Sequence, residues 1–185
     1  MSSVKLEIGV SEEMGDTSDI KEQLNKRDIR SFTYEKCLES IKALGEKYAE
    51  RGLSIVANYP VNKESKTKDK LNIMADGASL WRVLENLYNN AFKYAAEGSR
   101  VYIDMRKTED GKAEFVIKNI SASPLNISAD ELAERFVRGD VSRNTEGSGL
   151  GLSIAGSLTR IQGGEFRIEI DGDLFKAFIV FDLVE

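Results

Sequence analysis

Three glycines alternate with other residues at the junction between a polar loop and an apolar helix. The run GSGLGL, residues 147–152, leads into a helical pattern over residues 150–162. Glycine lets the backbone approach an anion closely and adopt positive φ angles. A helix N-terminus adds unpaired N–H groups and a partial positive charge. The run therefore predicts a cradle for phosphate groups, with a flexible glycine-rich turn as the alternative interpretation.

The glycine run matches neither of two common phosphate-binding motifs. No Lys-Ser/Thr pair follows it, as in a Walker loop, and position 152 is Leu where a dinucleotide fingerprint has its third glycine. Arg138 and Arg143 flank the polar loop that precedes the run. Because guanidinium groups suit phosphate oxygens, we interpret this loop as a lid tipped with arginines. Ordinary surface arginines are the alternative.

A second candidate site lies on the helix predicted from the N-cap Asp76 to about Ala96. Asn86, Asn90 and Lys93 recur at spacings i, i+4 and i+7 beside the apolar stripe of this helix. Asparagine forms helices poorly, but its amide oxygen suits Mg²⁺. Lys93 adds a positive charge for phosphate oxygens, and Tyr94 offers a flat surface for a base. A solvated polar face explains this helix alone equally well.

The periodicity of the apolar residues predicts an α+β fold, in which one mixed sheet carries helices on one face. Charged residues 62–70 predict a hairpin loop between the first two strands, Asp110-Gly111 predicts a second hairpin, and Asp171-Gly172-Asp173 predicts a final one. Residues 1–31 are polar, apart from a short predicted strand at 4–10, and are assigned to a tail or linker. Predicted strands are 53–60, 71–75, 100–108, 112–120, 165–170 and 174–183, and predicted helices are 33–51 (ended by Gly52), 76–96, 128–136 and 150–162.

The composition narrows the classes of function. The 185 residues carry a formal net charge of −5 without a basic stripe, which argues against nucleic-acid binding. There is no histidine, which excludes Ser-His-Asp catalysis and the usual zinc centres. Cys37 is the single cysteine, so a reducing compartment fits. No apolar run approaches the roughly 20 residues of a membrane span, and we see no secretory leader. We therefore predict a cytoplasmic location.

Together these motifs resemble the ATP-binding catalytic domain of sensor histidine kinases, in the Bergerat-fold superfamily that includes DNA gyrase. "ENLYNNAFKY" (85–94) resembles the N box, "ERFVRGD" (134–140) resembles the F box and lid entrance, and "GSGLGLSIA" (147–155) is similar to the G2 box. The resemblance covers residues 32–185, which we assign to one domain. It implies a two-layer α+β sandwich with one mixed, mostly antiparallel sheet, helices on one face and an ATP lid loop.

The resemblance implies roles for individual residues. Asn86 and Asn90 would take the Mg²⁺-associated positions, Lys93 would reach the phosphates of ATP, and Tyr94 would lie against the adenine. The remaining implied contacts are Arg138 at the γ-phosphate, Arg143 in the lid, Phe136 as the lid anchor, the backbone of Gly147, Ser148, Gly149 and Gly151 around the triphosphate, and Leu150 and Leu152 as a wall of the pocket.

The sequence departs from the family pattern at three places. Asn119, in "KNISASPLNIS", stands where the family's G1 box has an aspartate that accepts from the adenine amino group. Its carbonyl can still accept and its NH₂ can donate, but a neutral amide should bind adenine more weakly than a carboxylate. The stretch "GDLFKAFIV" lacks the usual Gly-Thr of the last hairpin. The phosphoacceptor histidine is missing, so we expect it on another domain of a larger receptor.

The resemblance implies that the domain binds Mg-ATP and donates the γ-phosphoryl group to a histidine on a separate dimerisation domain, which then serves a response regulator. The fragment itself would be a monomer without membrane contact, at the cytoplasmic end of a membrane-bound receptor. Superfamily members that hydrolyse ATP carry a glutamate base where Asn86 stands, so we expect very slow hydrolysis. The alternatives are an anti-sigma-type serine kinase, which Asn86 disfavours, and a non-catalytic nucleotide-sensing or docking module, which the altered G1 stretch favours.

Overall fold

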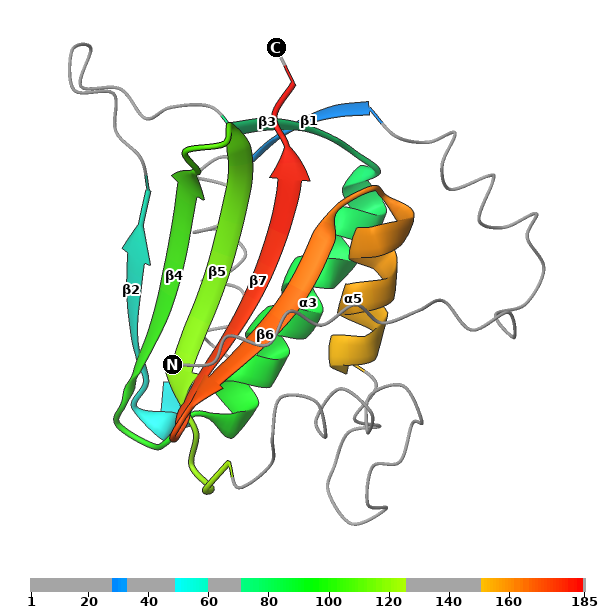
Figure 1. Ribbon diagram of the computed structural model, residues 1–185. Helices are drawn as coiled ribbons and strands as arrows, with labels where there is room; N and C mark the ends of the chain where they lie inside the picture. The colour runs from blue at the N-terminus through cyan, green and yellow to red at the C-terminus, as the bar shows by residue number, and fades with distance from the viewer. Residues whose placement is uncertain (1–27, 33–48, 60–70, 126–150, 185) are drawn as a thin grey trace.

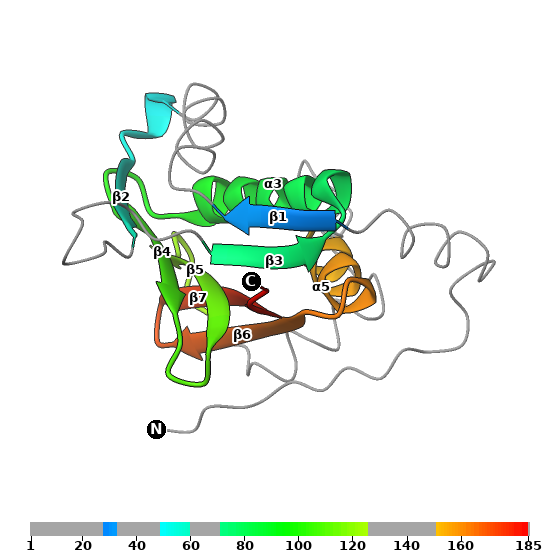
Figure 2. The same cartoon turned by 90° about the horizontal axis from the view of Figure 1, so that it is seen from above.

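A five-stranded sheet with both described α-helices on one face forms the body of the protein (Figures 1 and 2). The computed structural model describes residues 28–32, 49–59, 71–125 and 151–184. Helices α3 (Gly77–Tyr94) and α5 (Gly151–Ile161) lie side by side against the sheet. In sheet order the strands are β2 (Ser54–Asn58), β4 (Arg100–Lys107), β5 (Lys112–Ile120), β7 (Leu174–Asp182) and β6 (Glu165–Asp171).

The sheet is mixed and mostly antiparallel, which confirms the predicted two-layer α+β sandwich. Only β2 pairs in parallel, with β4, while β4–β5, β5–β7 and β7–β6 are antiparallel. The two tight hairpins turn at Gly111 (φ 79°) and Gly172 (φ 59°). These positive φ angles are ones that glycine adopts without the strain of a Cβ, so both turns follow from the sequence.

A second, two-stranded sheet corrects one prediction. Strand β3 (Leu71–Ala75) does not form a hairpin with β2; it pairs antiparallel with β1 (Asp28–Phe32). In β3 the side chains of Leu71, Ile73 and Ala75 are buried, and Ile73 also bridges to Leu183 beyond β7. Which strands pair depends on which faces they bury. The charged loop at 62–70 showed only that β2 and β3 follow one another in the sequence, and this does not determine that they pair. Strand β1 begins inside the segment that we assigned to the tail.

Helix α3 begins at the predicted N-cap and packs one face on the sheet. The Asp76 side chain accepts a hydrogen bond of 2.7 Å from the backbone N–H of Ser79, which satisfies a free donor of the first turn. The helix ends at Tyr94, two residues before the predicted end at Ala96. Its buried residues are Leu80, Val83, Leu84, Leu87, Tyr88, Ala91 and Phe92.

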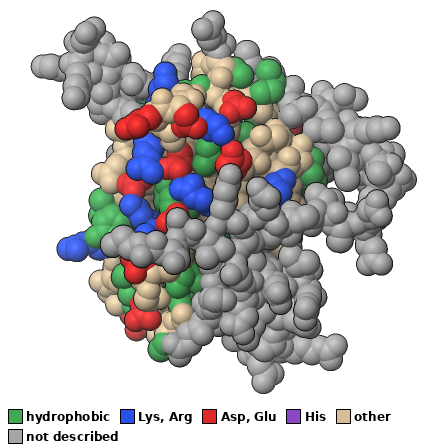
Figure 3. Space-filling view, viewed as in Figure 1, with side chains coloured by type: hydrophobic (Ala, Val, Ile, Leu, Met, Phe, Trp, Pro, Cys, Tyr) green, Lys and Arg blue, Asp and Glu red, His purple; other side chains and the backbone are tan. Residues whose placement is uncertain are grey.

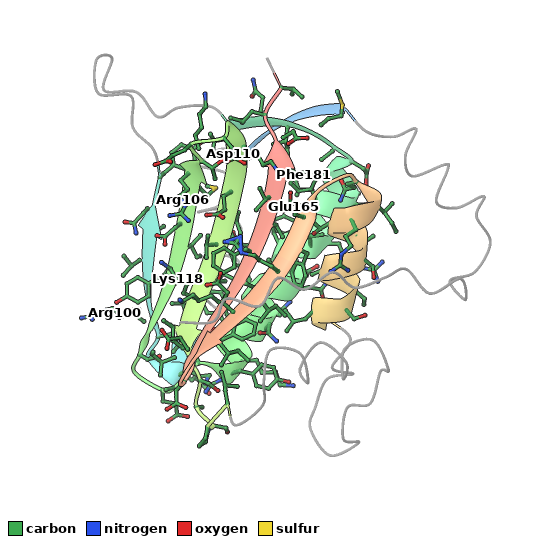
Figure 4. All side chains as sticks on the ribbon, viewed as in Figure 1. Arg100, Arg106, Asp110, Lys118, Glu165 and Phe181 are labelled. Carbon is green, nitrogen blue, oxygen red and sulfur yellow. The ribbon has the colours of Figure 1, made fainter. Side chains whose placement is uncertain are left out.

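Helix α5 ends in a close turn onto β6. The backbone N–H of Gly163 (φ 86°) donates to the carbonyl of Arg160, and that of Gly164 donates to the carbonyl of Thr159. A Cβ added to Gly164 would lie 2.7 Å from the ring of Phe181, which Figure 4 labels on β7. Only glycine fits here without displacing a core aromatic ring.

The face of the sheet away from the helices carries interleaved charges (Figures 3 and 4). Glu114 on β5 is only 5% exposed and forms ion pairs with Arg106 on β4 and Arg167 on β6. Lys112 pairs with Glu165 at 2.7 Å. Because each pair joins neighbouring or next-neighbouring strands, this face ties the sheet together across its width.

Several predicted elements lie outside the described residues: the strand at 4–10, the helix at 33–51 except its last turn, the loop at 62–70, the helix at 128–136 and the lid. Gly52 has φ 61°, as a residue that ends a helix is expected to have. Within the described ranges, no helix combines the length and the apolar character that crossing a membrane requires.

Candidate functional site

The C-terminal half of α3 places the predicted asparagines at the edge of the core. Asn86, Asn90 and Lys93 are all half-buried, as expected for a stripe beside the apolar face. The Nδ2 group of Asn86 donates a hydrogen bond of 2.8 Å to the carbonyl of Arg82, one turn earlier. Since this bond occupies the amide nitrogen, Oδ1 of Asn86 is directed away from the backbone of α3.

The start of α5 lies against this carboxamide. A Cβ added to Gly151 would lie 3.1 Å from Oδ1 of Asn86. The other ends of the two helices also meet, because the backbone N–H of Asp76 donates to Oε1 of Gln162 at 2.9 Å. The helices therefore run in opposite directions, and the fold brings the end of the glycine run to the middle of α3. These two motifs lie far apart in the sequence. Their contact is therefore produced by tertiary packing.

Leu152, the second residue of α5, anchors this junction. Its side chain is 3% exposed and belongs to the same core cluster as Leu87 and Ala91 of α3. Burial of a leucine side chain is worth about 2 kcal/mol. The first turn of α5, where backbone N–H groups have no partner within the helix, is therefore held firmly beside Asn86.

Asn119 is an exception in the row of core residues on β5. Ala113, Phe115 and Ile117 alternate with outward residues and are buried under the helices, and Asn119 continues that row at the strand's end. Its side chain is 2% exposed, and Oδ1 has no hydrogen-bond partner in the part of the chain that the structure describes. An unpaired buried amide oxygen costs about 1–3 kcal/mol, so the position calls for a ligand that donates a hydrogen bond.

Backbone bonds join the end of α3 to the end of β5, close to Asn119. The N–H of Ala96 donates to the carbonyl of Ile120, and the N–H of Ala122 donates to the carbonyl of Tyr94, both at 2.8 Å. The ring of Tyr94 is 41% exposed, and the ammonium group of Lys93 lies 5.2 Å from its centroid. The residue that carries this exposed ring therefore lies next to the end of β5, where Asn119 is located.

Arg51, which sequence reasoning missed, fixes the C-terminus of α3. One of its Nη atoms donates to the carbonyls of Phe92 and Lys93, and the other donates to that of Ala95 at 2.7 Å. These carbonyls have no partner within the helix, and a cation there also suits the helix dipole. A basic residue directly before Gly52 was the signal in the sequence, but its partner is 41 residues away.

Among the described residues, the structure brings Gly151 against Asn86, and Asn90, Lys93 and Tyr94 follow Asn86 along α3. Asn119 lies at the end of β5, which is hydrogen-bonded to the end of α3. Amide oxygens are suitable ligands for Mg²⁺, which takes few protein ligands and keeps waters and phosphate oxygens, so the side chains of Asn86 and Asn90 fit that ion. The other predicted site residues, namely Phe136, Arg138, Arg143, Gly147, Ser148, Gly149 and Leu150, lie outside the described residues.

Comparison with known proteins decides the family. Residues 75–182 match the family described as histidine kinase-, DNA gyrase B- and HSP90-like ATPases. The chain belongs to this ATPase family. This confirms the resemblance deduced from the N and G2 boxes, and it makes the protein a member of a nucleotide-binding family.

Two of the curated relatives are named as a probable sensor protein and as a signal transduction histidine-protein kinase/phosphatase. The chain is 34% identical over 114 residues to the probable sensor protein PcoS of Escherichia coli, with 60% of this chain and 24% of PcoS covered. It is 34% identical over 97 residues to the histidine-protein kinase/phosphatase MprB of Mycobacterium leprae, with 52% of this chain and 19% of MprB covered. The chain thus spans about a quarter or less of these curated relatives.

A solved structure shares the fold. The mycobacterial sensor histidine kinase MprB superposes with a TM-score of 0.64 at 21% identity, covering 85% of this chain and 99% of that one. At this identity the likeness supports the α+β sandwich and its topology.

Proposed function

We propose that this chain is the ATP-binding catalytic domain of a sensor histidine kinase. It would bind Mg-ATP at the C-terminal half of α3 and donate the γ-phosphoryl group to a histidine on a separate dimerisation domain. The observation that carries the proposal is the approach of Gly151 to Oδ1 of Asn86, because it joins an amide ligand on α3 to the free N–H groups at the start of α5. Residues 32–185 would form this domain and residues 1–31 a linker.

Each residue in the proposal has a proposed role. Asn86 and Asn90 hold Mg²⁺, which when bound neutralises charge on the phosphate oxygens. Lys93 and Arg138 contact the phosphates. The base lies between Tyr94 and Asn119, whose buried Oδ1 lacks a partner in the described part of the chain. The contacts proposed for the lid and the glycine run are Phe136, Arg143, Gly147, Ser148, Gly149, Leu150, Gly151 and Leu152.

The reaction needs positioning and charge stabilisation more than covalent chemistry from the protein. The bond between the γ-phosphorus and the bridging oxygen of ADP breaks, a phosphorus–nitrogen bond forms to the acceptor imidazole, and the imidazole loses its proton. This chain holds no histidine, so the acceptor comes from another domain. Asn86 cannot act as a base for water, so transfer to histidine is favoured over hydrolysis.

The partners follow from that reaction. The direct partner is the histidine-bearing dimerisation domain of the parent kinase, and a response regulator receives the phosphoryl group from that domain afterwards. The parent protein would be a membrane-bound receptor with this domain at its cytoplasmic end, and the isolated domain would be a monomer.

Transfer of label from [γ-³²P]ATP to an added histidine-bearing helical hairpin of the parent kinase tests the proposal. We expect acid-labile label on the hairpin, and none on a hairpin whose histidine is replaced by Gln or with the Asn90→Ala domain. Acid-stable label on a serine would identify the anti-sigma-type kinase instead. Nucleotide binding without any transfer would identify a docking module.

A further inference from the structure

We propose that Asn119 makes the base subsite accept 6-oxopurine nucleotides as well as ATP. This inference rests on the proposed function, and it names the class of nucleotide that the same site takes. It starts from a carboxamide that is 2% exposed at the inner end of β5 and whose Oδ1 has no partner among the described residues. A buried polar atom of this kind either binds a ligand or loses its hydration without compensation.

The strand pairing holds Asn119 in place from both sides. It lies opposite Val101 of β4 and Phe175 of β7, both buried. The backbone that follows is also fixed, since the N–H of Ser121 donates to the carbonyl of Asp173 at 2.8 Å. The side chain therefore has little choice of position, and its remaining freedom is rotation about the bond to the amide group.

That rotation changes what the side chain can recognise. A carboxamide has an oxygen that accepts and an NH₂ group that donates, and a half-turn exchanges the two. In the described structure the half-turn breaks no hydrogen bond of Oδ1, because Oδ1 makes none. One orientation accepts from the 6-amino group of adenine, and the other donates to the 6-oxo group of hypoxanthine or guanine.

A carboxylate at this position would behave differently. It only accepts hydrogen bonds at neutral pH, so it would pair strongly with a 6-amino group and repel a 6-oxo group. Sites whose buried polar groups are left unpaired by the wrong substrate discriminate by factors of about 10⁴. A group that pairs with either substrate loses that discrimination. We therefore expect weak selection between the two purine classes here and strong selection in Asn119→Asp.

The test compares dissociation constants of Mg-ATP, Mg-ITP and Mg-GTP by calorimetry for the whole chain and for Asn119→Asp. In the wild type we expect the dissociation constant of ITP to exceed that of ATP by no more than about tenfold. In Asn119→Asp we expect this ratio of dissociation constants to rise to about 100-fold or more. ITP is the decisive ligand, since it lacks the 2-amino group of GTP. If ITP binds and GTP does not, the 6-position proposal stands and the site is closed at the 2-position.

A wild type that binds ATP and rejects ITP by 100-fold, with the same ratio in Asn119→Asp, would overturn this inference and leave the proposed function intact. A wild type that binds none of the three nucleotides would overturn the proposed function itself. Asn119→Leu provides a second variant of similar volume. In this variant the binding of ATP and the binding of ITP should weaken by the same factor. If Asn119→Asp melts too early to be titrated, the wild-type ratio and Asn119→Leu still decide the question.

Discussion

Gly151, the first residue of α5, lies against the carboxamide of Asn86 in the middle of α3, and a Cβ on that glycine would lie 3.1 Å from Asn86 Oδ1. The same oxygen is turned outward because the amide nitrogen donates to the carbonyl of Arg82. Oδ1 of Asn86, in the N box, therefore lies at the point where the G2 box begins helix α5. The contact leaves room for a hydrogen atom but little room for a methyl group.

Gly151→Ala tests whether this close approach serves binding. We expect Mg-ATP affinity to fall by about tenfold because Asn86 Oδ1 must move, while stability stays within about 1 kcal/mol since alanine favours a helix over glycine. Calorimetry and thermal melts measure the two effects. Ser157→Ala, on the same helix, is the matched control and should change neither. Unchanged affinity in Gly151→Ala would separate this contact from nucleotide binding.

Replacing the carboxylate beside Asn86 tests the expectation of slow hydrolysis. Glu85 is adjacent to Asn86 but is turned about 100° around the helix, so it does not point where Asn86 points. We expect Glu85→Gln to leave the low rate of phosphate release unchanged within about twofold, which is a free-energy difference of about 0.4 kcal/mol. Brisk hydrolysis that survives Asn86→Ala and disappears in Glu85→Gln would contradict our assignment.

Arg51 should contribute strongly to the stability of α3. Arg51→Ala removes hydrogen bonds to the carbonyls of Phe92, Lys93 and Ala95, and we expect a loss of about 2–3 kcal/mol in the free energy of unfolding. Arg51→Lys keeps the charge but not the planar guanidinium group, so its free energy of unfolding should lie between those of Arg51→Ala and the wild type. Urea unfolding checks the order. Equal stability of all three proteins would show that the cap is not needed.

Gly164→Ala should destabilise the domain through overpacking. The added Cβ would lie 2.7 Å from the Phe181 ring and 2.9 Å from Cγ2 of Thr159, and insertions of this kind cost about 1–3 kcal/mol. Phe181→Leu combined with Gly164→Ala should be less destabilised than the sum of the two single variants, because the smaller side chain makes room. Strict additivity of the three unfolding free energies would show that the two residues do not compete for space.

The sequence predicted the elements more reliably than their partners. The N-cap Asp76, the hairpins at Gly111 and Gly172 and the end of α5 depend on local chemistry, and all were predicted correctly. The pairing of β3 with β1 was not, because it depends on a polar segment that gave no hydrophobic signal. Within the site, helical spacing placed Asn86 and Asn90 on one face. The alternation along β5 pointed to the burial of Asn119, and a basic residue before Gly52 pointed to a cap. The partners of both residues depend on tertiary packing, so the sequence did not reveal them.

Calorimetric titration with an ATP analogue tests the central claim most directly. The analogue has an imido group between its β and γ phosphorus atoms, and it is titrated into the wild type and into Asn90→Ala, in the presence of Mg²⁺ or of a chelator. Adenosine, which has no phosphates, serves as the reference ligand. We predict that Asn90→Ala weakens binding of the Mg²⁺ complex at least about tenfold, or 1.4 kcal/mol, and leaves adenosine binding unchanged. Equal losses for both ligands, or no effect of chelator on the wild type, would contradict a magnesium-bound triphosphate at the asparagines of α3.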